Sequence, residues 1–100
     1  MPALDDVLAR IDHNLDDALK RLFGLLEIRS ISADPAYKDD CARAAQWLAD
    51  ELNGLGFEAS VRPTAGHSMV VAHAKSKRRE VPHVLFYGHY DVQPADPLEL

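Results

Sequence analysis

The stretch VPHVLFYGHYDVQPADP, residues 81–97, joins an apolar run to a polar turn and decides how the rest of the chain is interpreted. Val81 and residues 84–87 form a run that only Pro82 and His83 interrupt. Such a run is typical of a β-strand covered on both faces at the centre of an α/β sheet, and these strands present functional residues at their carboxyl ends. We therefore predict a strand over residues 81–87 and a functional turn directly after it.

His89 and Asp91 are the candidate functional residues of that turn. Residues two apart in extended backbone point to the same face, so these two side chains are expected to lie together. Neutral imidazole is a zinc ligand, and a neighbouring carboxylate can accept the other ring N–H and orient the ring. A structural histidine at a strand end is the alternative interpretation, and the pattern by itself leaves both open.

Two amphipathic helices are predicted before this strand. Over residues 4–28 and again over residues 37–55, apolar residues recur at a spacing of three to four. The second apolar stripe is rich in alanine and includes Cys41, which permits close packing against a helix or a sheet. The segment between the helices contains Ser30 and Ser32, which we interpret as capping and turn residues.

Two further strands are predicted between the second helix and the apolar run. Residues 57–61 alternate between apolar and polar side chains, and residues 68–74 are mostly small or β-branched. The sequence therefore predicts an α/β fold of two helices followed by three strands, forming part of a mixed central sheet. A central strand with only two others beside it leaves an apolar edge unpaired.

Composition narrows the classes of function. Hydrophobic residues make up 47% and charged residues 27% of the 100 residues, which is typical of a folded globular protein. The net charge of −5 argues against nucleic acid or an anionic membrane as a partner. Cys41 is the single cysteine, so we expect no disulfide and a reducing, cytoplasmic location. We also expect no secretory leader and no membrane span, since no apolar run approaches roughly 20 residues.

Three segments together resemble a known family. VLFYGHYDVQPADP, residues 84–97, closely resembles the first metal-binding motif of the carnosinase/aminoacylase family of dinuclear zinc peptidases, peptidase family M-twenty, in its dipeptidase branch. SISADPAY, residues 30–37, and AAQWLADELNGLGF, residues 44–57, are similar to the N-terminal region of that family. The resemblance implies that His89 is a metal ligand and that Asp91 is the catalytic-site carboxylate that holds its ring.

The resemblance also implies the chemistry. Members of this family hydrolyse amide bonds with two zinc ions, sometimes manganese or cobalt, that activate a shared water. The implied partner is a small peptide or an N-acyl amino acid, and the implied assembly is a homodimer. The family completes its site with a bridging aspartate, a glutamate base, further ligands and a lid domain, and none of these maps onto the present residues.

We accordingly expect residues 1–100 to be the N-terminal part of the catalytic domain of a metal-dependent dipeptidase, inactive by themselves. Two alternatives remain. One is an N-acyl amino-acid deacylase of the same family. The other is a non-catalytic binding or assembly module, should the 100 residues be the whole protein.

Overall fold

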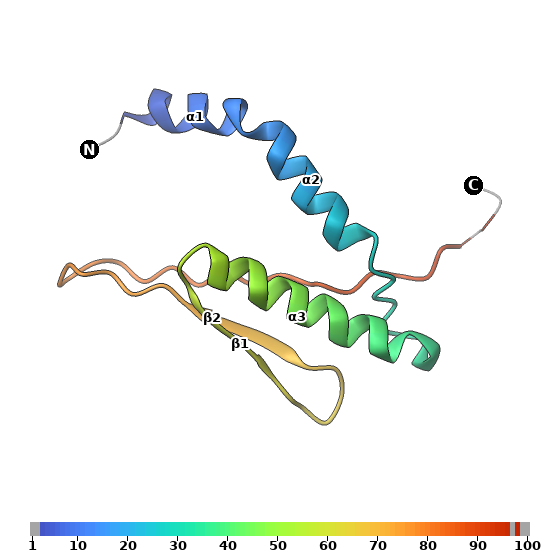
Figure 1. Cartoon of the computed structure of the whole chain (residues 1–100). Coiled ribbons are helices and arrows are strands. Elements are labelled where there is room, and N and C mark those ends of the chain that lie inside the picture. The colour runs from blue at the N-terminus through green and yellow to red at the C-terminus, as the bar shows by residue number, and fades with distance from the viewer. Residues whose placement is uncertain (1–2, 97, 99–100) are drawn as a thin grey trace.

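The described residues form three α-helices, one short 3-10 helix and a two-stranded sheet (Figure 1). The structure is a computed structural model that describes residues 3–96 and residue 98. The elements in chain order are α1 (Leu4–His13), α2 (Leu15–Leu26), a short 3-10 helix (Pro35–Tyr37), α3 (Lys38–Gly54), β1 (Glu58–Arg62) and β2 (Met69–His73). The predicted mixed α/β class is confirmed, whereas the predicted number of strands is not.

The core lies between α3 and the sheet. The fully buried hydrophobic side chains among the described residues are all small and lie on one face of α3: Cys41, Ala44, Ala45 and Ala49. β1 and β2 pair antiparallel, from Glu58 opposite His73 to Arg62 opposite Met69, and both contact α3. Small side chains let the helix approach the sheet closely. The predictions for α3, β1 and β2 are therefore confirmed to within one residue at each end.

The junction between α3 and β1 is closed by an asparagine. The Asn53 amide nitrogen donates to the carbonyl oxygen of Ala59 at 3.1 Å, and the Ala59 N–H donates to the Asn53 amide oxygen at 2.9 Å. Gly56, in the turn between these residues, has a φ of 96°, a conformation that favours glycine. The chain thus changes direction directly after α3 and enters β1, which contacts that helix.

The prediction of one continuous helix over residues 4–28 is wrong. Asn14 has φ −97° and ψ 8°, and the helix bends there into α1 and α2. Asparagine is a weak helix former, and no residue of either described helix is buried against a surface that would keep the two collinear. α2 meets α3 where Gly24 lies against the indole of Trp47.

The predicted third strand over residues 81–87 is absent from the described structure. Leu85 and Phe86 are 93% and 92% exposed. β1 and β2 pair with each other and not with residues 81–87. Within the described residues, the backbone after this segment pairs only at Val92, in a parallel bridge with Ile31. An apolar run becomes a strand only where neighbours pair with it, and here none does. Pro97, at the end of the same stretch, lies outside the described residues.

Much apolar surface remains uncovered. The chain exposes 8966 Å², whereas a compact protein of this mass exposes about 5,700 Å². The radius of gyration is 16.7 Å, against about 13 Å for a compact domain of 100 residues. The uncovered surface comprises the apolar face of α1 and α2 and the run at residues 84–87. Among the described residues, no helix combines the length and apolar character that crossing a bilayer requires.

Candidate metal site around His89 and Asp91

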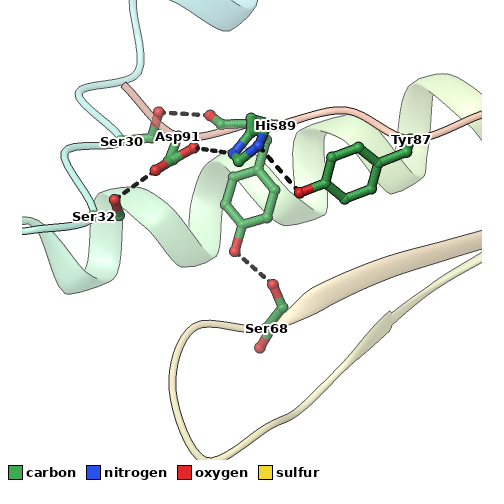
Figure 2. A network of polar contacts seen from close by, with 7 residues as sticks. Ser30, Ser32, Ser68, Tyr87, His89 and Asp91 are labelled. Atoms are coloured by element: carbon green, nitrogen blue, oxygen red, sulfur yellow. Dashed lines mark hydrogen bonds and ion pairs between the residues drawn. The ribbon is translucent and has the colours of Figure 1, made fainter. Parts of the chain in front are cut away.

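His89 and Asp91 lie together, as their spacing predicts (Figure 2). The His89 Nδ1 is 3.2 Å from the Asp91 Oδ1. An ionised carboxylate only accepts hydrogen bonds, so Nδ1 carries the proton and donates it. The Nε2 of the same ring therefore has a free electron pair. The contact assigns one protonation form, with its lone pair on the far side of the ring from Asp91.

The Tyr87 hydroxyl lies opposite that lone pair. Its oxygen is 3.2 Å from the His89 Nε2, and the two rings meet edge to face with centroids 5.4 Å apart. With Nδ1 protonated, the hydroxyl donates and Nε2 accepts. The His89 side chain is still 69% exposed, so Nε2 is reachable from solvent.

The second oxygen of Asp91 is held by Ser32. The Ser32 hydroxyl donates to the Asp91 Oδ2 at 2.6 Å (Figure 2). This hydrogen bond is the main cause that lowers the pKa of the Asp91 carboxyl, and His89 lowers it further against the opposing effect of partial burial. Asp91 therefore stays ionised and keeps both oxygens as acceptors.

A neighbouring serine fastens the backbone of the same segment. The Ser30 hydroxyl donates to the Tyr90 carbonyl oxygen at 2.8 Å, and the Val92 N–H donates to the Ser30 carbonyl oxygen at 2.9 Å. Ser30 is only 1% exposed. These two bonds frame Asp91 between fixed positions on either side of it.

The loop between β1 and β2 supports the site from a third direction. The Tyr90 hydroxyl donates to the Ser68 carbonyl oxygen at 2.6 Å, and the His67 Nε2 donates to the Ser32 carbonyl oxygen at 2.9 Å. Partial burial raises the pKa of the Tyr90 hydroxyl above its ordinary range, so it remains a donor. Three segments far apart in sequence thus meet around Asp91, and the loop contacts the neighbours Tyr90 and Ser32.

The residues present fit one position of a metal site. A histidine that holds a metal through Nε2 ordinarily donates its other ring N–H to a carboxylate or carbonyl, which is the arrangement of His89 and Asp91. Among the described residues, no three histidine, cysteine, aspartate or glutamate side chains gather as a metal-binding group. The described residues therefore present one oriented imidazole, which would fit a single ligand position, rather than a whole coordination sphere.

The interpretation of Ser30 and Ser32 as capping and turn residues is wrong for their side chains. Asp34, rather than either serine, caps the 3-10 helix by accepting from the Ala36 N–H at 2.9 Å. The serine hydroxyls instead contact residues 59 and 60 positions away. No local pattern encodes such partners. The available signal was that residues 30–37 and residues 84–97 resemble the same family.

Comparison with known proteins gives two relatives. The chain is 30% identical over 95 residues to a cysteinylglycine-S-conjugate dipeptidase of Corynebacterium striatum, covering 87% of this chain and 21% of that protein. It is 28% identical over 102 residues to a Cys-Gly metallodipeptidase of Schizosaccharomyces pombe, covering 93% of this chain and 21% of that protein. No family model matches, and no solved structure gives a significant match. The chain spans about a fifth of the length of these relatives and is similar to the two dipeptidases along nearly all of its own length.

Proposed function

We propose that this chain is the N-terminal part of the catalytic domain of a metal-dependent dipeptidase, in the dipeptidase branch of the carnosinase/aminoacylase family. The observation that carries the proposal is the contact between His89 and Asp91, which places the Nε2 lone pair on the side of the Tyr87 hydroxyl in a ring that solvent reaches. The similarity of the chain to two dipeptidases supports the same assignment. The uncovered apolar surface supports the view that further chain completes this domain.

In this proposal each residue has a distinct task. The His89 Nε2 holds one of two zinc ions, with manganese or cobalt as substitutes, and Asp91 keeps Nδ1 protonated and the ring oriented. Bound metal ions of this kind polarise the scissile carbonyl and activate water. The other ligands and the general base are supplied by parts of the protein other than residues 1–100.

The proposed substrate is a dipeptide with a free amino group. Cys-Gly is the first to test, because one relative is named for Cys-Gly and the other for S-conjugates of cysteinylglycine. An N-acyl amino acid is the alternative substrate class. We further propose a cytoplasmic homodimer. The buried free thiol of Cys41 supports a reducing compartment, and the dimer is tested by the mass of the native protein in solution.

The experiment uses the full-length product of the natural gene. Hydrolysis of Cys-Gly and of an N-acetylated amino acid is measured with zinc, manganese or cobalt and after chelation, together with bound metal by elemental analysis. We expect hydrolysis of Cys-Gly that chelation abolishes. His89→Ala should remove this activity and lower the bound metal, because an imidazole ligand is lost.

His83→Ala is the matched control, since His83 is an exposed histidine six residues earlier on the same segment. It should retain both metal and activity. Near-normal turnover with full zinc occupancy in His89→Ala would overturn the proposal. Faster hydrolysis of the N-acetylated substrate would replace the dipeptidase by the deacylase.

A non-catalytic assembly module is the second candidate, and the exposed apolar face of α1 and α2 favours it. It predicts a natural gene product of 100 residues that neither binds zinc through His89 nor hydrolyses either substrate. Intact mass of the natural protein separates the two candidates directly.

A further inference from the structure

We propose that Ser32 is a positioning residue of this site, which selects through Asp91 the protonation form of His89 that has its free lone pair on Nε2. The consequence for metal binding rests on the proposed function, whereas the effect on the His89 ring does not. Ser32 acts indirectly, because its hydroxyl contacts Asp91 and not the His89 ring.

The geometry forms one directed chain of hydrogen bonds. The Ser32 hydroxyl donates to Oδ2 of Asp91 at 2.6 Å, and Oδ1 of the same carboxylate accepts from the His89 Nδ1 at 3.2 Å (Figure 2). The carboxylate torsion of aspartate is broad when nothing holds it. Fixing one oxygen on Ser32 therefore fixes where the other oxygen lies, and that oxygen decides which ring nitrogen keeps the proton.

Ser32 is itself held independently of Asp91. Its carbonyl oxygen accepts from the His67 Nε2 at 2.9 Å, and the adjacent Ile31 pairs with Val92 in the parallel bridge. Ser30, two residues earlier, is bonded on both sides of Asp91. The backbone that carries the Ser32 hydroxyl is thus held by bonds that do not involve the Asp91 side chain.

Loss of the hydroxyl has a defined chemical effect. Without Ser32 the carboxylate turns, Nδ1 loses its acceptor for part of the time, and the proton moves to Nε2 in that fraction of molecules. A protonated Nε2 cannot bind a metal. Removing the hydrogen-bond partner of a metal-binding histidine weakens metal affinity 10–100-fold, and Ser32 acts one bond further away, so we expect a loss of about tenfold.

The test determines which nitrogen of the His89 ring carries the proton before any metal is added. In the metal-free protein, at a fixed pH where the ring is neutral, the two ring nitrogen-15 shifts of His89 report which nitrogen carries the proton. We expect a single form protonated on Nδ1 in the wild type, a mixture in Ser32→Ala, and recovery in Ser32→Thr, which restores the hydroxyl. Zinc affinity should fall about tenfold in Ser32→Ala and recover in Ser32→Thr.

Ser60→Ala is the matched control, because it removes a hydroxyl on β1 that accepts from Arg62 and takes no part in the contacts around Asp91. It should leave the nitrogen-15 shifts of His89 unchanged. If Ser32→Ala does not fold, Ser32→Cys takes its place, since a thiol is a weaker donor of similar shape and should shift the ring in the same direction.

Unchanged nitrogen-15 shifts in Ser32→Ala or Ser32→Cys overturn the inference, even where zinc binding depends on His89. Equal changes in the nitrogen-15 shifts in Ser60→Ala and Ser32→Ala also overturn it, because they assign the effect to a general change of the fold. If Ser32→Ala changes the nitrogen-15 shifts of His89 but His89→Ala does not change zinc binding, the proposed function is overturned. The positioning role of Ser32 is then still supported.

Discussion

Replacing Ala45 with leucine tests whether the face of α3 that packs on the sheet has spare room. Ala44 and Ala45 are 0% exposed, and Cys41 and Ala49 are 1% exposed on the same face. The face lies directly against β1 and β2. Leucine at residue 45 adds three carbon atoms at a fully buried position on the helix that contacts both strands.

Two effects of opposite sign compete in this variant. If the added carbons found room, their burial would stabilise the fold by roughly 0.8 kcal/mol for each, about 2 kcal/mol in all. If no room exists, overpacking forces α3 away from the sheet at a cost of about 1–3 kcal/mol. Because the buried residues on this face are uniformly small, we expect the second effect to win and the free energy of unfolding to fall by about 1–3 kcal/mol.

Urea denaturation followed by the fluorescence of Trp47 measures this change, since Trp47 is the only tryptophan and lies on α3. Ala42→Leu is the matched control, because Ala42 is exposed on the same helix and undergoes the same chemical change. It should alter stability by less than about 0.5 kcal/mol. Equal stability of the two variants, or a more stable Ala45→Leu, would refute the close packing of α3 on the sheet.

Two further predictions concern the backbone and the buried thiol. Gly56→Ala should destabilise the chain by about 1 kcal/mol because its φ is 96°, whereas Gly54→Ala, which has open space around it, should leave thermal stability unchanged or raise it; equal melting temperatures would contradict the strained turn. Burial, and secondarily the charges of Asp91 and Asp40, raise the pKa of the Cys41 thiol above its ordinary value of 9.0, so the folded state favours the neutral thiol. Stability from this source is complete below pH 9.0 and is lost as pH rises toward the folded-state pKa, which urea denaturation across that range measures against Cys41→Ala as the control lacking this loss.

The parts of the fold that sequence predicted correctly are those whose causes are local. The stripe of small residues on α3 repeats at helical spacing, and β1 and β2 show strand composition on either side of a turn. The contact of His89 with Asp91 is likewise a relation between residues two apart in extended backbone. Each of these features depends on only a few consecutive residues, so each can be predicted without knowledge of the rest of the molecule.

The wrong predictions concern features that depend on distant partners. Periodicity continues through Asn14, yet the helix bends there because nothing in the described structure holds α1 and α2 in line. Residues 81–87 have the composition of a strand, but a strand also requires neighbouring strands to pair with, and the described residues provide none for this segment. The side-chain roles of Ser30 and Ser32 could not be predicted from their local sequence, because the partners of their hydroxyls lie about 60 positions away.

By itself, the sequence determined the mixed α/β class, the helix that packs on the hairpin, and the pairing of an imidazole with a carboxylate. How that carboxylate is held depends on contacts between distant segments. Ser32 donates to Asp91, the loop before β2 bonds the Ser32 carbonyl oxygen, and the parallel bridge pairs the neighbouring residues Ile31 and Val92. The physical reason is the range of the interactions. Backbone geometry sets which side chains within a few residues share a face, whereas hydrogen bonds between segments form only after the chain has folded and brought them together.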